Sequence, residues 1–523
     1  MDPTDTPLPT ALELPPEEPP PAPKPTPVAH APSSPTPTPH TTLHRNVSPF
    51  RALIVVIAAF VGLFLVLRTI AVEPFGVPTG SMAPALSGHH RDGFCPRCNY
   101  TVRVGRPTSG NVNEHFRKVT CPNCDYHPLS LADARDLSGD RLLVDKNIYD
   151  LRSPRRWEMV VFRCPNPNEE FGKPYVKRLV GLPGETITIV DGDVYVNGLI
   201  ARKGLAEVRE TLFPVFDMNF APTGGWHIRW VSEPGGDPRL PLGAAPKATG
   251  SPAIENNALV MDASSTPQAT TTIRYRHWHL DDRKEKPVFA WNSYDGPTRR
   301  SDLPIAHDFY LTCEVEVIAA VGAAGEACFD CRLNDGADTV TAELTVGPRK
   351  TGRAQLIREG HGGLSTASGV ALEPERKYKL EFAFVDRRVI LALNGRVVAP
   401  PVDLEAPVRR EPESKPLRFG ARGCRVVVRD LKLFRDIHYT AESNDYHGTR
   451  NPAVLGPREY FVLGDNSGNS EDSRKWPTPA VPESSLIGKP FLIHQPLRLG
   501  RMSVGGRERE FPMLDWSRLR WLH

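Results

Sequence analysis

The longest hydrophobic run of the chain lies near its N-terminus. Residues 52–67 contain only apolar side chains and glycine, and residues 70–72 extend the run past Arg68. About 20 apolar residues are enough for one helix across a bilayer. We therefore predict a transmembrane helix at 50–72. A cleaved export signal is the alternative, which the length of the run and of the segment before it disfavours.

The segment before this run, residues 1–49, is rich in proline, with repeated Pro-Pro and Pro-Thr-Pro sequences. It has too little apolar surface to offset the loss of chain entropy on folding, so we predict a disordered tail. Arg45 and Arg51 flank the N-terminal side of the run. The positive-inside rule then places the tail in the cytoplasm and the chain after Val72 outside.

Alternation of apolar and polar residues predicts β-strands in the second half of the chain. In residues 311–317 and 378–384, every second side chain is apolar, so that the apolar side chains share one face. Turns are predicted at Asp386-Arg387-Arg388 and Asn394-Gly395, and the alternation slips near Asp430, which indicates a bulge. These features predict a β-sandwich. Residues 186–198 form a predicted hairpin that turns at Asp191-Gly192.

Length and charge narrow the classes of protein. A chain of 523 residues is long enough for several domains, and its formal net charge is +3. So small a charge gives no reason to expect a nucleic-acid partner.

Two polar residues carry the candidate chemistry. Ser81 lies in VPTGSMAP just beyond the apolar run, and Lys177 lies in YVKRLVGLPGE. A serine hydroxyl becomes a good nucleophile when an adjacent base removes its proton. A lysine, whose free pKa is about 10.4, acts as such a base only when burial keeps it neutral. The apolar residues around Lys177 are suited to that, but composition alone does not pair these two residues.

The pairing comes from a resemblance. Four segments, in this order, resemble the bacterial type I signal peptidase (leader peptidase) family, and the ending DWSRLRWLH resembles a family terminus. The segments are RTIAVEPFGVPTGSMAPAL (68–86), GDRLLV (139–144), KRLVGLPGE (177–185) and YFVLGDNSGNSEDSR (460–474). The family is mostly β, which the predicted hairpin after the lysine segment matches.

The resemblance implies a role for each matched residue. Ser81 would be the nucleophile and Lys177 the general base, and no cofactor is implied for the chemistry. The Ser81 backbone N–H and the Thr79 hydroxyl are the candidates for the oxyanion hole. Ser470 would orient the lysine. A charged set would hold the third segment against the site: Arg178, Asp465, Asp472 and Arg474.

The chain departs from the family pattern at Thr79, a candidate for the oxyanion hole, and at two places that carry no catalytic chemistry. Thr79 stands where serine is frequent, Ala85 where threonine is common, and Ser467-Gly468 where Arg-Asp often follows Gly-Asp-Asn. Threonine keeps the hydroxyl, so the first change should be tolerated. The others leave the geometry of the loops open.

An insertion at 89–135 holds two CxxC pairs, Cys95/Cys98 and Cys121/Cys124. Duplicated pairs of this kind suit a tetrahedral zinc ion, because each turn presents two thiolates to one metal. One or two disulfides are the alternative in an oxidising compartment. We favour a zinc-ribbon-like structural site.

A second insertion, 206–437, contains the predicted sandwich. Its sequence is similar over two hairpins to concanavalin-like lectin and glucanase sandwiches. Glycan binding is the functional interpretation and a structural decoration is the favoured one. His277 and His279 share a strand face and are interpreted as surface residues, and Cys328 and Cys331 as a disulfide or simple strand cysteines.

The predicted fold class is mostly β: a signal-peptidase-type catalytic domain behind one N-terminal transmembrane helix, with an inserted β-sandwich. The catalytic domain is split into 73–205 and 438–523. The predicted function is a membrane-anchored Ser–Lys endopeptidase that removes signal peptides from exported preproteins at the outer side of a bacterial inner membrane. The alternatives are a membrane-anchored glycan- or partner-binding protein on a peptidase scaffold, and a peptidase dedicated to a few partners or to itself.

Overall fold

The computed structural model describes residues 49–107, 110–167, 171–233, 251–279, 282–297, 303–323, 325–442, 445–504 and 507–522. Apart from residue 49, the predicted disordered tail at 1–49 lies outside the described residues. The chain divides into two units, Met1–Gly62 and Leu63–His523, and each is described by itself.

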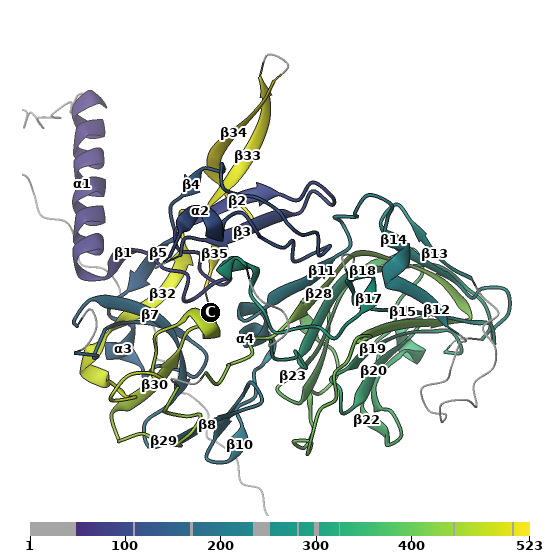
Figure 1. Cartoon of the computed structure of the whole chain (residues 1–523). Helices are drawn as coiled ribbons and strands as arrows, with labels where there is room; N and C mark the ends of the chain where they lie inside the picture. The colour runs from purple at the N-terminus through teal and green to yellow at the C-terminus, as the bar shows by residue number, and fades with distance from the viewer. Residues whose placement is uncertain are drawn as a thin grey trace, which may run out of the picture. The chain divides into compact units, whose positions relative to one another are not determined.

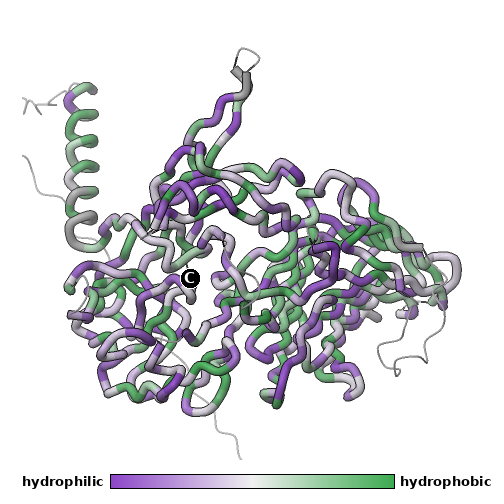
Figure 2. Tube along the Cα trace, viewed as in Figure 1, coloured by the Kyte–Doolittle hydropathy of each residue, from purple (hydrophilic) through white to green (hydrophobic). Residues whose placement is uncertain are grey.

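The apolar run forms helix α1 (Pro49–Ile70). Figure 2 shows apolar residues on successive turns of this helix, and the side chains of Phe50, Ile54 and Phe60 are exposed. Within the described ranges, no helix meets the combined length and hydropathy that a membrane crossing requires. A helix is present over most of the predicted range 50–72 and ends at Ile70, before β1 begins at Val72. That this helix crosses a membrane stays a prediction.

The serine and lysine segments belong to one antiparallel sheet of strand order β1-β5-β32-β6-β7-β30-β31, with β35 paired to β32 (Figure 1). Strands far apart in the sequence meet here, because β30 and β32 follow the large insertion and pair with β7, β5 and β6. The strands are β1 (Val72–Gly76), β5 (Arg141–Asp145), β6 (Met159–Arg163), β7 (Pro174–Gly181), β30 (Glu459–Leu463), β31 (Val481–Pro482), β32 (Leu486–Ile493) and β35 (Arg520–Trp521).

A second sheet of the core has the order β10-β9-β8-β29. It contains the predicted hairpin, β8 (Thr186–Val190) and β9 (Asp193–Val196), with β10 (Leu199–Ile200) and β29 (Ala453–Val454). Asp191 and Gly192 both adopt positive φ at its turn. The hairpin prediction is confirmed.

The large insertion forms two further antiparallel sheets whose apolar faces share one buried core. One sheet has the order β13-β14-β28-β18-β23-β24-β25, with β11 on β28 and β26 on β24; the other has the order β12-β15-β27-β19-β20-β21-β22. The first consists of β11 (Phe213–Asp217), β13 (Ser251–Glu255), β14 (Ala258–Asp262), β18 (Phe309–Ala320), β23 (Lys377–Val385), β24 (Arg388–Leu393), β25 (Arg396–Val397), β26 (Val402–Asp403) and β28 (Cys424–Arg435), and the second of β12 (Trp230–Glu233), β15 (Thr270–Tyr275), β19 (Cys328–Asn334), β20 (Thr339–Thr345), β21 (Arg353–Arg358), β22 (Gly362–Ser368) and β27 (Leu417–Arg422).

The strand patterns read from the sequence are confirmed in this sandwich. The apolar positions predicted in β18 and β23 are buried, and Asp386, Arg387 and Asn394 adopt positive φ in the predicted turns. The predicted bulge is present, because the β18–β28 register shifts next to Asp430, which also has positive φ.

The insertion leaves and rejoins the core at neighbouring points. Phe213 of β11 pairs with Arg435 of β28, so the two ends of the sandwich are held together as adjacent strands. A buried lysine of the core, Lys203, secures the junction by donating to Asp386 at 3.0 Å and to Asp436 at 2.7 Å.

The CxxC insertion forms a small sheet of order β3-β2-β4, and its cysteines belong to the same buried cluster as the sandwich core. The remaining elements are short or peripheral. They are β2 (His90–Phe94), β3 (Thr101–Gly105), β4 (Asp136–Leu137), β16 (Trp278–His279), β17 (Lys284–Glu285), β33 (Leu497–Val504), β34 (Arg507–Leu514), α2 (Val112–His115), α3 (Ile148–Leu151), α4 (Leu205–Glu210), and the 3-10 turns η1 (His227–Arg229), η2 (Ser293–Asp295), η4 (Arg349–Thr351), η5 (Ser467–Asn469) and η6 (Glu483–Ser485).

One interpretation of the second insertion is wrong. His277 and His279 are buried rather than on the surface. Their rings contact edge to face, with centroids 5.0 Å apart, and His279 Nδ1 lies 3.1 Å from Asp125 of the CxxC insertion. The two insertions therefore pack on each other. Cys328 and Cys331 are free cysteines of β19.

Candidate active site

Ser81 lies in a compact turn directly after β1. The turn is closed by a hydrogen bond from Ala83 N to Gly80 O of 3.0 Å, and Met82 and Ala83 next to the serine are fully buried. These buried neighbours fix the backbone, while the Ser81 side chain stays half-buried at the edge of a cleft.

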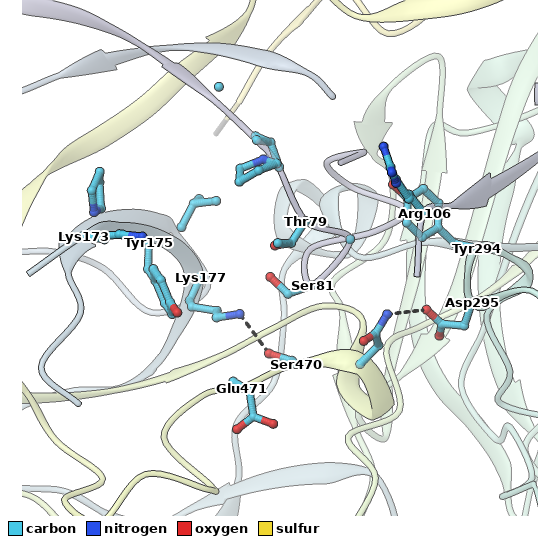
Figure 3. A pocket seen from close by; sticks show the side chains of 18 of the residues that line it. Thr79, Ser81, Arg106, Lys173, Tyr175, Lys177, Tyr294, Asp295, Ser470 and Glu471 are labelled. Carbon is cyan, nitrogen blue, oxygen red and sulfur yellow. Dashed lines mark hydrogen bonds between the residues drawn. The ribbon is translucent and has the colours of Figure 1, made fainter. Parts of the chain in front are cut away.

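Lys177 reaches the same cleft from strand β7. Its backbone pairs with Val160 of β6, and the next residue, Arg178, pairs with Leu463 of β30. The lysine is 3 % exposed. Its Nζ donates a hydrogen bond to Ser470 Oγ at 3.0 Å. Figure 3 shows this pair beside Ser81.

The cleft has a volume of about 660 Å³ and is lined by Thr79, Ser81, Lys177 and Ser470 among others. Its apolar lining includes Phe75, Val77, Leu142, Val161 and Val176. The structure thus brings together the nucleophile, base, lysine-orienting and oxyanion candidates, although they are far apart in the sequence. Thr79 is exposed and lies beside Ser81 (Figure 3).

Gly464 allows the third segment to approach the serine. A Cβ on Gly464 would lie 2.1 Å from Ser470 Oγ and 2.6 Å from Ser81 O. Both distances are far below van der Waals contact, so any side chain here would push Ser470 and Ser81 apart. The glycine is therefore a steric requirement of the site.

Asn466 ties the third segment to the serine turn through backbone and side chain. Its backbone N–H donates to Ser81 O at 3.0 Å, and its side-chain Nδ2 donates to Gly80 O, also at 3.0 Å. The position of Ser81 relative to the third segment therefore depends on the orientation of one asparagine.

Arg178 and Asp465 form a buried ion pair behind the lysine strand. Arg178 donates to Asp465 through Nε at 2.7 Å and through Nη2 at 2.6 Å. Burial opposes the charge on Arg178, but the Asp465 carboxylate outweighs this effect and raises the pKa of the arginine. This fork-like pair joins β7 to the loop after β30.

Asp472 and Arg474 form a second buried pair. Arg474 donates to Asp472 through Nε at 2.9 Å and Nη2 at 2.8 Å. Asp472 also accepts from Gly464 N at 3.0 Å. Burial alone would raise the pKa of Asp472, but Arg474, together with the nearby Lys177, lowers it. The pair thus fixes the backbone at Gly464.

Ser467, one of the departures from the family pattern, belongs to this network. Its Oγ accepts from Arg474 Nη1 at 2.8 Å and from Thr440 N at 2.9 Å. The sequence left open the geometry of the loop at 467–468. Ser467, which stands where the family often has arginine, fixes this loop through these two hydrogen bonds. Ala85, the other such departure, is buried.

The four cysteines of the first insertion converge. Cys95 Sγ lies 3.6 Å from Cys124 Sγ, and Cys98 Sγ lies 3.7 Å from Cys121 Sγ. All four sulfurs lie within 4.8 Å of one another and are buried, and none of them forms a disulfide.

Comparison with known proteins matches residues 131–211 and 389–494 to the family described as signal peptidase, peptidase S26. The chain contains a region similar to peptidase S26. Lys177, Arg178 and Ser470 lie within the matched residues, whereas Ser81 precedes them. The second matched segment begins inside the sandwich, at β24.

Curated relatives agree with this family. The chain is 40% identical over 78 residues to a probable signal peptidase I-2 of Synechocystis, covering 14% of this chain and 34% of the relative. It is 31% identical over 151 residues to signal peptidase I of Pseudomonas aeruginosa, covering 28% and 38%. The chain therefore spans about a third of the length of these relatives.

Solved structures match parts of the chain weakly. A carbohydrate-binding module, CBM66 of Bacillus subtilis, covers 39% of this chain with 94% of its own, at 10% identity and a TM-score of 0.23. The exoplasmic/lumenal domain of VIP36 covers 41% with 85% of its own, at 9% identity and a TM-score of 0.26. TM-scores this low support no statement about fold or ligand.

Sequence reasoning missed several residues that hold the peptidase-like site. Asp140 Oδ2 accepts from Ser87 N at 2.7 Å and from Arg518 at 2.6 Å, and Arg518 also donates to Pro84 O at 2.9 Å. Both residues stand in segments that the resemblance had identified, so their position was a signal. Tyr294 and Asp295 of the sandwich also line the cleft, and no local pattern marks them.

The close approach at Gly464 predicts that Gly464→Ala destabilises the folded chain. Overpacking of this kind costs about 1–3 kcal/mol in the free energy of unfolding. The matched control is Gly468→Ala in the same loop, because a Cβ there meets its nearest atom, Glu442 Oε1, at 3.5 Å. We expect a lower chemical denaturation midpoint for the first variant only. Equal midpoints would contradict the steric argument.

Proposed function

We propose that this chain is a membrane-anchored serine endopeptidase that removes signal peptides from exported preproteins. Ser81 is the nucleophile and Lys177 the general base. The proposal rests above all on the 3.0 Å hydrogen bond between Lys177 Nζ and Ser470 Oγ, in a cleft that Ser81 also lines. The peptidase S26 match and the signal peptidase relatives support the substrate class.

The reaction begins with attack of Ser81 Oγ on the scissile carbonyl carbon, and Lys177 Nζ takes the hydroxyl proton. Collapse of the tetrahedral intermediate breaks the C–N bond. Lys177 then returns the proton to the leaving amine of the mature chain. A water molecule, deprotonated by the same lysine, then attacks the acyl carbon. The C–O bond to Ser81 breaks, Lys177 returns the proton to Ser81 Oγ, and the signal peptide leaves with a new carboxyl terminus.

Lys177 must be neutral to act as a base, and its surroundings are suited to that. The residue is 3 % exposed, and removal from water destabilises an ammonium relative to an amine. The nearby Asp472 carboxylate is already engaged by two hydrogen bonds from Arg474. Lys177 lowers the pKa of this carboxylate, and the same interaction favours the ammonium, so burial of the amine has to outweigh it for the lysine to act as a base.

The oxyanion of the tetrahedral intermediate needs donors preorganised around Ser81. We assign this role to the Ser81 backbone N–H and to the hydroxyl of Thr79, which lies beside Ser81 (Figure 3). The apolar wall of the cleft, with Phe75, Leu142 and Val176, is suited to small apolar side chains before the cleaved bond.

Cleavage of a test preprotein should depend on both members of the dyad. We expect Ser81→Ala and Lys177→Ala to lower kcat at least about 1,000-fold, as loss of a nucleophile or base does in serine peptidases. Lys177→Arg should also be inactive, because arginine stays charged. The control, exposed Lys350→Ala, should cleave normally. The measurement is gel-resolved cleavage by the full chain in detergent, and undiminished cleavage by Lys177→Ala would refute the dyad.

We assign membrane anchoring to α1, because its described apolar side chains are exposed. They include Phe50, Leu53, Ile54, Val55, Val56, Ile57, Phe60, Val61, Leu63, Phe64 and Val66. Burial of apolar area of this kind stabilises a helix in lipid by about 25 cal/mol per Å². With the tail cytoplasmic, the site would face the outer side of a bacterial inner membrane.

Placing a charge in the middle of α1 should weaken the anchor. An aspartate at the centre of a spanning helix costs about 2.5–3.5 kcal/mol on insertion scales, so Phe60→Asp should increase the fraction of the full chain that alkaline carbonate extracts from membranes. The control is Phe171→Asp, which changes a phenylalanine of similar exposure, 70% against 73%, outside α1. Full extraction of the unmodified chain would rule out the anchor.

We further assign a structural zinc ion to the four converging cysteines. Tetrahedral coordination with Zn–S bonds of about 2.3 Å places sulfurs about 3.8 Å apart, close to the 3.6 and 3.7 Å found here. A disulfide requires a sulfur–sulfur distance of about 2.05 Å, so this arrangement suits the metal better. The ion would hold the CxxC turns together and take no part in catalysis.

Metal content tests this assignment. The purified chain should contain about one zinc per molecule, and Cys95→Ser/Cys98→Ser should lose it, because two thiolate ligands are removed. Chelation should lower the thermal midpoint of the unmodified chain. The control Cys328→Ala changes a cysteine outside the cluster and should keep the metal. Disulfides detected by intact mass between the CxxC pairs, without metal, would overturn the assignment.

A further inference from the structure

The large insertion contributes directly to the wall of the catalytic cleft. Its η2 turn carries Tyr294 and Asp295 into the cleft, on the side opposite Lys177 and Tyr175 (Figure 3). The first insertion adds Gly105, Arg106 and His115 to the lining. One wall of the cleft is therefore made by inserted segments.

The η2 turn is firmly docked on the serine segment. Asn292 Nδ2 donates to Ala83 O at 3.2 Å. The Tyr294 ring is so close to Gly80 and Gly105 that a Cβ on either glycine would lie 2.3 or 2.0 Å from its Cε1 atom. Tyr294 itself is 4 % exposed. The turn therefore has a defined position relative to Ser81.

Asp295 accepts hydrogen bonds from two asparagines of the third segment. Its Oδ1 accepts from Asn466 Nδ2 at 2.6 Å and from Asn469 Nδ2 at 3.0 Å. Asn466 is the residue that bonds to the backbone of Gly80 and Ser81. Asn469 directly precedes Ser470, the acceptor for Lys177.

We propose that Asp295 is a positioning residue of the active site, through which the inserted sandwich sets the geometry between Ser81 and Lys177. Oδ1 of Asp295 holds the side-chain amide of Asn466, which bonds to the turn that carries Ser81. The same oxygen holds Asn469, which directly precedes Ser470, the acceptor for Lys177. The inference rests on the proposed peptidase function. It adds that the sandwich is part of the catalytic apparatus.

The role requires an acceptor oxygen and not a charge. Burial raises the pKa of Asp295 to about 6, although its hydrogen bonds from Asn466 and Asn469 act in the opposite direction. The ionised form is therefore destabilised by its surroundings. A neutral acceptor of the same shape should preserve the two hydrogen bonds.

The test compares Asp295→Leu with Asp295→Asn in the full chain. Leucine removes the acceptor, so we expect kcat on a test preprotein to fall about tenfold or more with KM nearly unchanged, as misplacement of reacting groups does. Asparagine keeps an acceptor oxygen and should restore kcat to within about threefold of the unmodified chain. Glu411→Ala, an exposed insertion residue paired with Arg409, is the matched control.

Thermal stability separates positioning from a merely structural role. The pKa of Asp295 is about 6 in the folded chain and about 3.9 when unfolded. Folding therefore favours the neutral acid. The contribution of Asp295 to the free energy of unfolding is lost as pH rises from about 4 to about 6. Asp295 borders this cleft and an adjoining cavity, and the other charged or titratable groups that line them are Arg106, His115, Lys173, Tyr175, Lys177, Tyr294, Arg435, His438, Glu442, Asp465, Glu471 and Lys475. We expect Asp295→Asn to unfold at or above the wild-type temperature at about pH 8, while Asp295→Leu loses kcat.

Hydrogen exchange keeps the inference testable if the proposed function fails. Asp295→Leu should accelerate exchange of the Asn466 amide, which bonds to Ser81 O, and Asp295→Asn should not. If the unmodified chain does not cleave the preprotein, the peptidase proposal fails and exchange alone decides the positioning role. If it cleaves, equal kcat for Asp295→Leu and the unmodified chain overturns the inference, as does unchanged exchange at Asn466.

Discussion

The structure of the site depends on satisfying polar groups that its strands remove from water. Strand β7 buries two consecutive basic side chains, Lys177 and Arg178, and a buried polar or charged group without a partner is strongly destabilising. Both partners come from the third segment, Ser470 for the lysine and Asp465 for the arginine. The fold therefore has to bring this segment against β7, where β30 pairs with it.

The third segment reaches β7 in spite of the large insertion because the insertion begins and ends on adjacent strands. Pairing of Phe213 with Arg435 returns the chain to the core near the point where it left. An insertion with neighbouring ends adds its own core without separating the strands on either side. The buried Lys203, bonded to Asp386 and Asp436, fixes the junction at the base of the sandwich.

The large insertion is joined to the core by hydrogen bonds between residues far apart in the sequence, such as Asn292 with Ala83 and Asp295 with Asn466. The CxxC insertion and the sandwich share one buried cluster, and both place residues in the cleft. Their joint packing gives the η2 turn a rigid support. Asp295 on that support accepts hydrogen bonds from two asparagines of the third segment and can hold them in place, which a side chain on a mobile loop would not do.

The sequence by itself determined the local elements and the order of the chemical segments. Alternation in β18 and β23 predicted a buried apolar face, because strand geometry places successive residues on opposite faces, although Glu381 and Ala383 on the other face of β23 are buried as well. The matched segments identified Ser81, Lys177, Ser470 and the charged pairs before any contact was known. The resemblance also paired Ser81 with Lys177, which composition alone did not do, whereas the sequence placed His277 and His279 wrongly on the surface.

The tertiary structure alone decided which distant residues share the cleft. Asp295 bonds to Asn466 across 171 positions, and Arg518 to Asp140 across 378. Such contacts have no periodicity or spacing in the sequence, because they depend on how separate sheets pack. Local patterns are governed by neighbouring residues along the chain, whereas the position of the inserted wall is governed by steric fit and by burial of polar groups that only the folded chain brings together.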